Sequence, residues 1–169
     1  MKTSIAGERA LVTGAGTGIG RAVATRLASL GCTVTLVGRT QQTLDETAAL
    51  CNDAAREAGH DTTAVTHTCD LTSEASILGL VATVAEEGGL DILVNNAGIV
   101  QAGPLEDIPT EQFDAVMATN VRAPFILMRE TLPLLRASKA AEIVNVCSVV
   151  AHAGYPNQSA YVASKHALY

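Results

Sequence analysis

Short runs rich in β-branched residues alternate along this chain with longer stretches that have helical periodicity. Parallel strands need a crossover connection between them, and this connection is usually a helix. The alternation therefore predicts β-α-β units and an α/β fold built on a parallel sheet. We expect strands at residues 10–13, 33–37, 63–67, 91–95 and 142–146. We expect helices at residues 18–30, 40–58, 72–87 and 110–136, with a further helix around Tyr161.

Composition narrows the class of protein. Hydrophobic residues make up 48% of the 169 residues and aromatic residues only 3%, so the core must be aliphatic, as in buried parallel sheets. A net charge of −6 without a Lys/Arg cluster argues against a nucleic-acid partner. We find no linker or repeat and expect one domain over residues 1–169.

Location and metal content are also expectations from composition. No apolar run approaches the roughly 20 residues of a membrane span, and the N-terminus has no apolar signal core, so we expect a cytoplasmic protein without a membrane partner. Cys32, Cys51, Cys69 and Cys147 lie far apart without metal-ligand spacing. We therefore expect reduced thiols, no disulfide and no metal site.

A glycine-rich stretch, T-G-A-G-T-G-I-G from Thr13 to Gly20, follows the first strand and opens the first helix. At such a junction the backbone N–H groups and the positive end of the helix dipole face an anion, for which a pyrophosphate is suited. The common dinucleotide fingerprint G-x-G-x-x-G does not fit, because Gly14, Gly18 and Gly20 give the spacing G-x-x-x-G-x-G. An ordinary glycine turn is the alternative.

Several further motifs occur in a fixed order: C-D-L at 69–71, N-N-A-G at 95–98, Asn120, Ser148, and Y-x-x-x-K at 161–165. Together with T-G-x-x-x-G-I-G they resemble the short-chain dehydrogenase/reductase family over essentially the entire chain. The resemblance implies a Rossmann-like, doubly wound parallel sheet with strand order 3-2-1-4-5 and helices on both faces. Family members normally continue through two more strands and a mobile loop, so we expect the last strands to be missing, as in a fragment truncated at its C-terminus.

The resemblance also implies where a dinucleotide would bind. Asp70 and Leu71 would meet the adenine, although an exposed capping Asp is the alternative for Asp70. Asn96, Ala97 and Gly98 would border the cofactor and steady the sheet. The residues implied to wrap the phosphates are Gly14, Thr17, Gly18, Ile19 and Gly20.

The end of the second strand bears on the choice of coenzyme. An acidic residue there accepts hydrogen bonds from the ribose 2′-OH of NAD, whereas a cation favours the 2′-phosphate of NADP. Gly38 removes the carboxylate, and Arg39 supplies a planar cation suited to phosphate. We expect NADP(H) to be preferred. NAD(H) stays an alternative, because Thr17 stands where many NADP-preferring relatives have a second basic residue, and Arg39 could also be a solvated residue at a helix start.

The reacting groups follow the fifth strand. Tyr161 and Lys165 are four residues apart on an expected helix, so both emerge on one face. An ammonium beside a phenol stabilises phenolate, which makes proton exchange with an alcohol or carbonyl oxygen efficient. Such a pair is common on any helix, but Ser148 lies at the family separation and could donate to the substrate oxygen. The resemblance implies that Tyr161 and Lys165 also bind the coenzyme, with Lys165 in contact with the nicotinamide ribose. Cys147 stands where relatives often have a second serine.

Asn120 precedes Pro124 by four residues, and proline has no N–H to give the carbonyl of residue i−4. In the resembled family the corresponding Asn holds, through its backbone oxygen, a water that links Lys165 to solvent. We therefore predict that Pro124 helps to free this oxygen. A merely kinked packing helix is the alternative.

The resulting functional hypothesis is an NADP(H)-dependent oxidoreductase that interconverts a carbonyl and a secondary alcohol with Asn120, Ser148, Tyr161 and Lys165. The resemblance extends to 3-oxoacyl-carrier-protein reductases and to ketone reductases, and the substrate stays open. A non-catalytic dinucleotide-binding module and an inactive truncated fragment are the alternatives. The resemblance further implies a homo-oligomer, a dimer or tetramer, formed by helix 110–136 and the Tyr161 helix; Phe125, Met128 and Leu132 could belong to this interface or to the core.

Overall fold

The computed structural model describes residues 4–169 and contains a five-stranded parallel sheet. The strand order is β3-β2-β1-β4-β5, and every pairing is parallel. This confirms the predicted Rossmann-like order. The strands are β1 (Arg9–Thr13), β2 (Thr33–Gly38), β3 (Val65–Thr68), β4 (Ile92–Asn95) and β5 (Glu142–Asn145).

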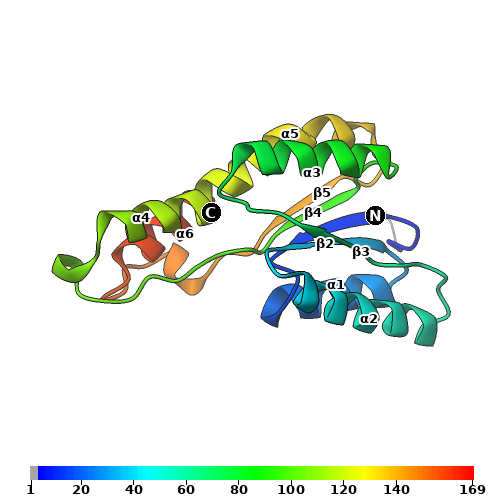
Figure 1. Ribbon diagram of the computed structural model, residues 1–169, viewed down its shortest axis with the longest axis horizontal. Helices are drawn as coiled ribbons and strands as arrows, with labels where there is room; N and C mark the ends of the chain where they lie inside the picture. Colours follow the sequence, from blue (N-terminus) through cyan, green and yellow to red (C-terminus); the bar gives the residue numbers. More distant parts are fainter. Residues whose placement is uncertain (1–3) are drawn as a thin grey trace.

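Helices cover both faces of the sheet (Figure 1). The helices α1 (Gly18–Ser29) and α2 (Gln41–Glu57) lie on one face, and α3 (Glu74–Glu86) and α5 (Ala123–Ala137) lie on the other. Beyond the carboxyl ends of the strands, α4 (Thr110–Met117) packs against α6 (Ser159–Leu168). Two 3-10 turns, η1 (Leu105–Asp107) and η3 (Val149–Ala151), precede α4 and α6.

The core forms two clusters, one on each side of the sheet, because successive side chains of a strand point to opposite faces. Val12 of β1 belongs to the cluster packed under α1 and α2, together with Ala24 and Leu44. Its neighbour Leu11 belongs to the other cluster, together with Ile77 of α3. Burial on both faces explains why the strands read as continuous apolar runs.

The strand β5 is one edge of the sheet, as expected from the sequence. Ile143 is 39% exposed and Val144 is 47% exposed, whereas every residue of the central strand β4 is buried. An edge strand presents unpaired backbone groups as well as these apolar side chains.

The single helix expected at 110–136 is wrong, because the structure interrupts it. The helix α4 ends at Met117, and a π-helical turn, η2 (Ala118–Arg122), separates it from α5. In this turn the N–H of Ala123 donates to the carbonyl of Ala118, five residues back. Pro124 then occupies the first turn of α5, where its missing N–H costs least. The apolar periodicity continues across the turn and therefore gave no sign of it.

The residues expected at a dimer interface or in the core divide between the two environments. Phe125 is 57% exposed and Leu132 is 37% exposed, while Met128 packs against the core cluster beneath α3 and α5. The other expected helices agree with the structure to within one or two residues at each end. The helix expected from 72 begins at Glu74, because the Ser73 hydroxyl caps it by accepting from the Ser76 N–H.

Candidate functional site

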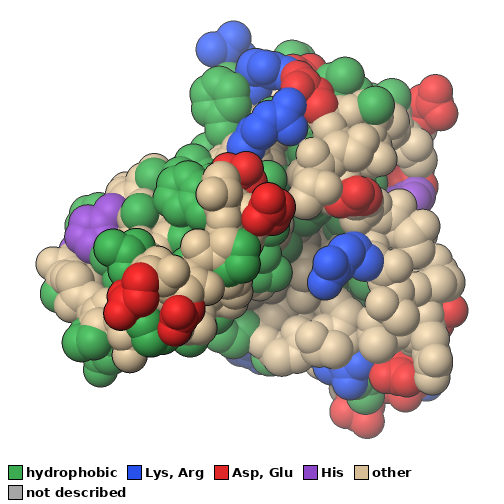
Figure 2. Space-filling view, turned by 60° about the vertical axis from the view of Figure 1, so that its left-hand side comes forward, with side chains coloured by type: hydrophobic (Ala, Val, Ile, Leu, Met, Phe, Trp, Pro, Cys, Tyr) green, Lys and Arg blue, Asp and Glu red, His purple; other side chains and the backbone are tan. Residues whose placement is uncertain are grey.

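A cleft lies at the carboxyl ends of the strands, where β1 is flanked by β2 on one side and β4 on the other. At this point the strand order reverses, and open α/β sheets bind ligands in such a crevice. Figure 2 shows the molecule hollowed in the middle of this view, with a basic side chain at the edge of the hollow. The cleft is lined by Gly14, Gly16, Thr17, Gly18, Ile19, Gly38, Arg39, Thr40, Thr43, Cys69, Asp70, Leu71, Thr72, Asn96, Ala97, Gly98, Ile99, Ala115 and Thr119.

The structure brings together nearly all the residues predicted to hold a coenzyme. Gly14, Thr17, Gly18, Ile19, Arg39, Asp70, Leu71, Asn96, Ala97 and Gly98 all line the cleft. Gly20, Tyr161 and Lys165 do not line it. Four separate loops therefore converge on one crevice, and their convergence is what the predicted cofactor site requires.

The glycine loop needs glycine for two different reasons. Gly14 and Gly18 have φ angles of +64° and +54°, which L side chains rarely adopt. Gly20 has an ordinary φ, but a Cβ there would overlap the carbonyl oxygen of Gly14 and the side chain of Asn96. Thr17 is the N-cap of α1, yet its side chain makes no capping hydrogen bond. The N–H groups of the first turn are thus left without a side-chain partner, as an anion site requires.

Asp70 serves a local turn as well as lining the cleft. Its Oδ1 accepts hydrogen bonds from the hydroxyl and the N–H of Thr72, at 2.7 and 2.9 Å. These hydrogen bonds hold the pKa of the exposed Asp70 carboxyl below its usual value. Asp70 thus stabilises the turn before α3 and still lines the cleft, whereas the N-cap of α3 is Ser73 rather than Asp70.

Asn96 joins β4 to the glycine loop. Its Nδ2 donates to the carbonyl of Thr13 at 2.9 Å, and its N–H donates to the Thr13 hydroxyl at 3.0 Å. The same hydroxyl also accepts from the N–H of Ala97 and donates to the carbonyl of Val94. The buried Thr13 side chain, which sequence reasoning did not select, fixes the two central strands where the cleft begins.

The α6 helix places Tyr161 and Lys165 beside the far end of the cleft. The Lys165 Nζ lies 5.9 Å from the centre of the Tyr161 ring and donates to the Val146 carbonyl at 2.8 Å. A Cβ on the cleft residue Gly98 would stand 3.7 Å from this Nζ. Lys165 is only 4% exposed, and this burial lowers its pKa, with a smaller opposing influence from Cys147.

Ser148 lies just past β5, at the start of the turn η3, which packs against α6. Its Oγ accepts a 3.4 Å hydrogen bond from the Val150 N–H. Within residues 4–169, no hydrogen bond joins the Ser148 and Tyr161 hydroxyls. Cys147 lies in the same loop, and its Sγ is 4.0 Å from the Lys165 carbonyl.

Asn120 is fully buried in the π-helical turn, and its side chain is completely engaged. Its Oδ1 accepts from the N–H of Ile99, and its Nδ2 donates to the Ile99 carbonyl, both at 2.9 Å. The Nδ2 also donates to the Ser164 hydroxyl of α6 at 3.0 Å. Asn120 thus ties the β4–α4 loop to the helix that carries Tyr161 and Lys165.

Gln101 is a second buried residue that joins this loop to α6, and no sequence pattern singles it out. Its Oε1 accepts from the N–H of Ala160 in the first turn of α6 at 3.0 Å, and its side chain is fully buried. Its Nε2 lies 3.4 Å from the carbonyl of Asn157, which also accepts from the Gly103 N–H. A glutamine in a loop is unremarkable in sequence, and only its burial marks it.

The comparison with protein families decides the identity. A family model described as short chain dehydrogenase matches residues 8–169. The chain belongs to the short-chain dehydrogenase family. This confirms the resemblance on which the predicted fold rests, and the family is one of oxidoreductases.

Curated dehydrogenases align along nearly all of this chain. A 2-(R)-hydroxypropyl-CoM dehydrogenase of Xanthobacter autotrophicus is 39% identical over 94% of the chain and 63% of its own length. A gluconate 5-dehydrogenase of Gluconobacter oxydans is 37% identical over 98% of the chain and 62% of its own length. The chain thus spans about three fifths of the length of these curated relatives.

Solved short-chain dehydrogenase structures have the same fold. One from Beutenbergia cavernae, provisionally described as an NAD(P)-dependent gluconate 5-dehydrogenase with NADP bound at low occupancy, superposes with a TM-score of 0.88. It is 34% identical, and the match covers 98% of this chain and 64% of that one.

The described residues also bear on metal and membrane binding. Over residues 4–169, no group of three or more His, Cys, Asp and Glu side chains is placed to hold a metal ion. All four cysteines are free. In the same described range, no helix is long and apolar enough to cross a membrane.

The buried Lys165 predicts a pH dependence of stability. In the unfolded chain, lysine has its ordinary pKa of about 10.4. Burial lowers the pKa of Lys165 in the folded protein. Between the two pKa values the unfolded chain binds more protons, so stability rises with pH in this window. Relative to Lys165→Met, the wild-type free energy of unfolding should increase as pH rises from the lowered pKa of folded Lys165 toward about 10. Urea denaturation at several pH values measures this difference.

The control for this prediction is Lys139→Met, since Lys139 is exposed. Its stability relative to wild type should not change with pH over the same range. If the difference in unfolding free energy between wild type and Lys165→Met is as independent of pH as that for Lys139→Met, the lowered pKa of Lys165 is contradicted.

Proposed function

We propose that this chain forms the coenzyme-binding and proton-transfer part of an NADP(H)-dependent oxidoreductase that interconverts a carbonyl and a secondary alcohol. One observation carries the proposal. Gly98, which lines the dinucleotide-type cleft, lies against the buried Lys165 Nζ, four residues from Tyr161 on the same helix. A nicotinamide at this end of the cleft would therefore stand beside a phenol and an ammonium.

Each of the residues Tyr161, Ser148 and Lys165 has a separate role in the proposed reaction. When bound, the coenzyme supplies a hydride for the carbonyl carbon. Tyr161 donates the proton to the carbonyl oxygen, and in the reverse direction it accepts the proton of the alcohol. Ser148 donates a hydrogen bond to the same oxygen as negative charge develops. Lys165, whose Nζ lies 5.9 Å from the centre of the Tyr161 ring, would hold the nicotinamide ribose.

For Asn120 we propose the proton-relay role through its backbone oxygen. Two features support this: the side chain is fully occupied by Ile99 and Ser164, and Pro124 has no N–H to give a carbonyl four residues earlier. The π-helical turn that contains Asn120 is a distortion of the kind found at functional sites.

The glycine loop would bind the pyrophosphate with the N–H groups of Thr17 to Gly20, and Asp70 and Leu71 would border the adenine. The preference for NADP(H) rests on Arg39, which is exposed at the cleft wall beside Thr40. Arg39 forms no hydrogen bond or ion pair with other residues of the described range 4–169. Its guanidinium is thus free to form a two-pronged contact with a 2′-phosphate.

Replacing Arg39 tests the coenzyme preference. Arg39→Ala should weaken NADPH binding about 10- to 100-fold, which is the value of a hydrogen-bonded charge pair, and should change NADH binding less than about threefold. Fluorescence titration with both coenzymes measures the two affinities. Equal weakening for NADH and NADPH would contradict the role of Arg39.

The activity itself is tested by following NADPH oxidation with a panel of ketones and 3-oxoacyl thioesters. Oxidation that depends on one of these carbonyls supports the proposal. NADPH binding without oxidation on any of them would favour a non-catalytic dinucleotide-binding module instead.

We further propose a cytoplasmic homo-oligomer, a dimer or tetramer, in which the exposed Phe125 and Leu132 of α5 lie in a subunit interface.

A further inference from the structure

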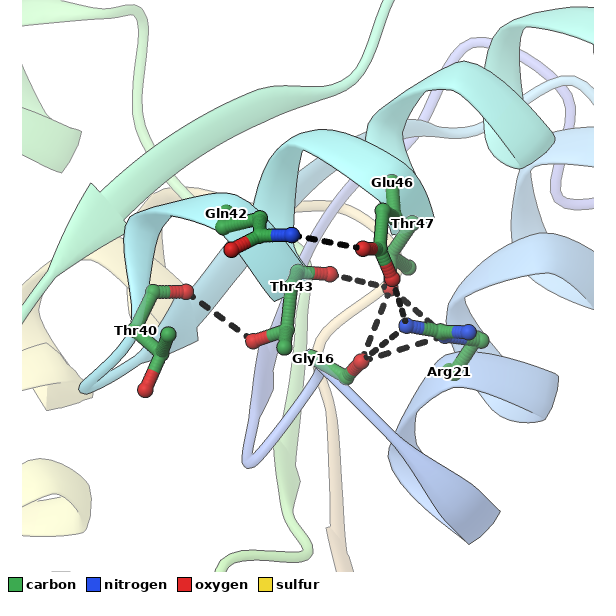
Figure 3. Close-up of polar contacts among 7 residues, drawn as sticks. All are labelled: Gly16, Arg21, Thr40, Gln42, Thr43, Glu46 and Thr47. Carbon is green, nitrogen blue, oxygen red and sulfur yellow. Dashed lines mark hydrogen bonds and ion pairs between the residues drawn. The ribbon is translucent and has the colours of Figure 1, made fainter.

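Arg21 lies in the first turn of α1, one residue after the glycine loop, yet it does not line the cleft. Its guanidinium turns back onto the loop and donates to the carbonyl of Gly16 through Nε at 3.1 Å and Nη2 at 2.6 Å (Figure 3). A cation beside a phosphate-binding loop is expected to face the phosphate. The Arg21 guanidinium instead donates its hydrogen bonds to a backbone carbonyl of the loop.

Two side chains of α2 hold the guanidinium in place. The Arg21 Nη2 forms an ion pair with the Glu46 carboxylate at 3.0 Å, and its Nε donates to the Thr47 hydroxyl at 3.0 Å. The Thr47 hydroxyl, which is fully buried, lies 3.3 Å from the Gly16 carbonyl and 3.0 Å from the Thr43 carbonyl. The Gly16 carbonyl is thus drawn toward α2 by donors from two helices (Figure 3).

The close packing of α2 leaves no room for a side chain at Gly16. A Cβ there would stand 2.5 Å from the Thr43 Oγ1, which itself donates to the Thr40 carbonyl. The loop and the start of α2 are therefore in direct contact at Gly16. Any rotation of this peptide must disturb the Arg21 contacts.

The orientation of one carbonyl sets the orientation of the next N–H group. In a planar trans peptide the C=O and the following N–H point in opposite directions, and residues 4–169 contain no cis peptide. Because the Gly16 carbonyl points to α2, the N–H of Thr17 points the other way. Both residues of this peptide, Gly16 and Thr17, line the cleft.

We propose that Arg21 is a positioning residue that locks the Gly16–Thr17 peptide with its N–H toward the coenzyme pyrophosphate. This inference rests on the proposed dinucleotide function. Without the lock, the peptide can rotate and present a carbonyl oxygen to the phosphate, which the negative charge disfavours. Arg21 acts through the backbone and touches no ligand itself.

The test compares two nucleotides, NADPH and 2′-AMP, of which only the first contains a pyrophosphate. Arg21→Met should weaken NADPH binding at least tenfold, as expected for lost hydrogen bonds to a charged group, and should leave 2′-AMP binding within twofold. Isothermal titration measures both. Arg21→Lys, which keeps the charge but not the planar fork, should recover part of the NADPH affinity.

Arg26→Met is the matched control. Arg26 lies on the same helix and has the Ser29 hydroxyl as its side-chain partner. The Arg26→Met variant should bind both NADPH and 2′-AMP with wild-type affinity.

Two results would overturn the proposal: unchanged NADPH affinity in Arg21→Met, or equal losses for NADPH and 2′-AMP, which would indicate a merely structural role. A wild-type protein that binds neither nucleotide would overturn the proposed function together with this inference. Wild-type binding of NADPH with an unaffected Arg21→Met variant would overturn the inference alone.

Discussion

Tyr161→Phe should lower turnover about 1,000-fold while leaving the affinity for NADPH within about threefold of wild type. The expected loss is that of a positioned general acid, which contributes about 10²- to 10⁴-fold to rate. The substitution removes one hydroxyl and keeps the ring, so the packing of the half-buried side chain is retained. The loss should appear in kcat, because the hydroxyl acts in the proton-transfer step.

The measurement is steady-state NADPH oxidation with an active carbonyl substrate, together with an NADPH titration of the same preparation. Tyr169→Phe is the control, because it removes the same atom from a residue that is 78% exposed on the same stretch of chain. Its ring contact with His152 should survive and its turnover should match wild type. A Tyr161→Phe variant that loses coenzyme binding as strongly as turnover would contradict the assigned role.

Gly20→Ala should weaken NADPH binding by more than about 100-fold and lower the free energy of unfolding by about 1–3 kcal/mol, the usual cost of overpacking. The added Cβ would overlap the Gly14 carbonyl oxygen and the Asn96 side chain. The first of these atoms belongs to the backbone and cannot move aside without displacing the loop. The start of α1 must therefore separate from the loop, and the N–H groups that face the phosphate move with it.

The control for Gly20→Ala is Gly79→Ala. Gly79 is also helical, in α3, but a Cβ there has no atom within 4 Å. Since alanine is the better helix former, this variant should gain up to about 1 kcal/mol of stability and bind NADPH normally. Urea denaturation and coenzyme titration measure both variants. A Gly20→Ala variant with wild-type affinity would show that close packing at Gly20 is not needed for the loop.

Much of this fold was accessible from the sequence because its signals are local. The alternation of β-branched and helical stretches predicted the parallel sheet, and the family resemblance implied the strand order that the structure has. Glycine is the residue that tolerates positive φ, and Gly14 and Gly18 of the glycine-rich stretch adopt it. The cofactor residues converge because the carboxyl ends of parallel strands share one edge.

Local sequence patterns did not predict features that depend on contacts between residues far apart in the chain. The π-helical turn at 118–122 leaves the apolar periodicity intact, so it was expected as continuous helix. The roles of Arg21 and Gln101 depend on Thr47 and Ala160, which are 26 and 59 residues away. Such pairings have no trace in neighbouring residues.

The sequence by itself thus determined the family, the layered sheet and the presence of a phosphate-type glycine loop, because propensity and spacing act over a few residues. Only the tertiary structure decided the direction of the Gly16 carbonyl, the hydrogen-bond partners of the Asn120 side chain, and the burial of Lys165. The physical reason is that these properties arise from contacts between helices and strands that meet only when the chain has folded.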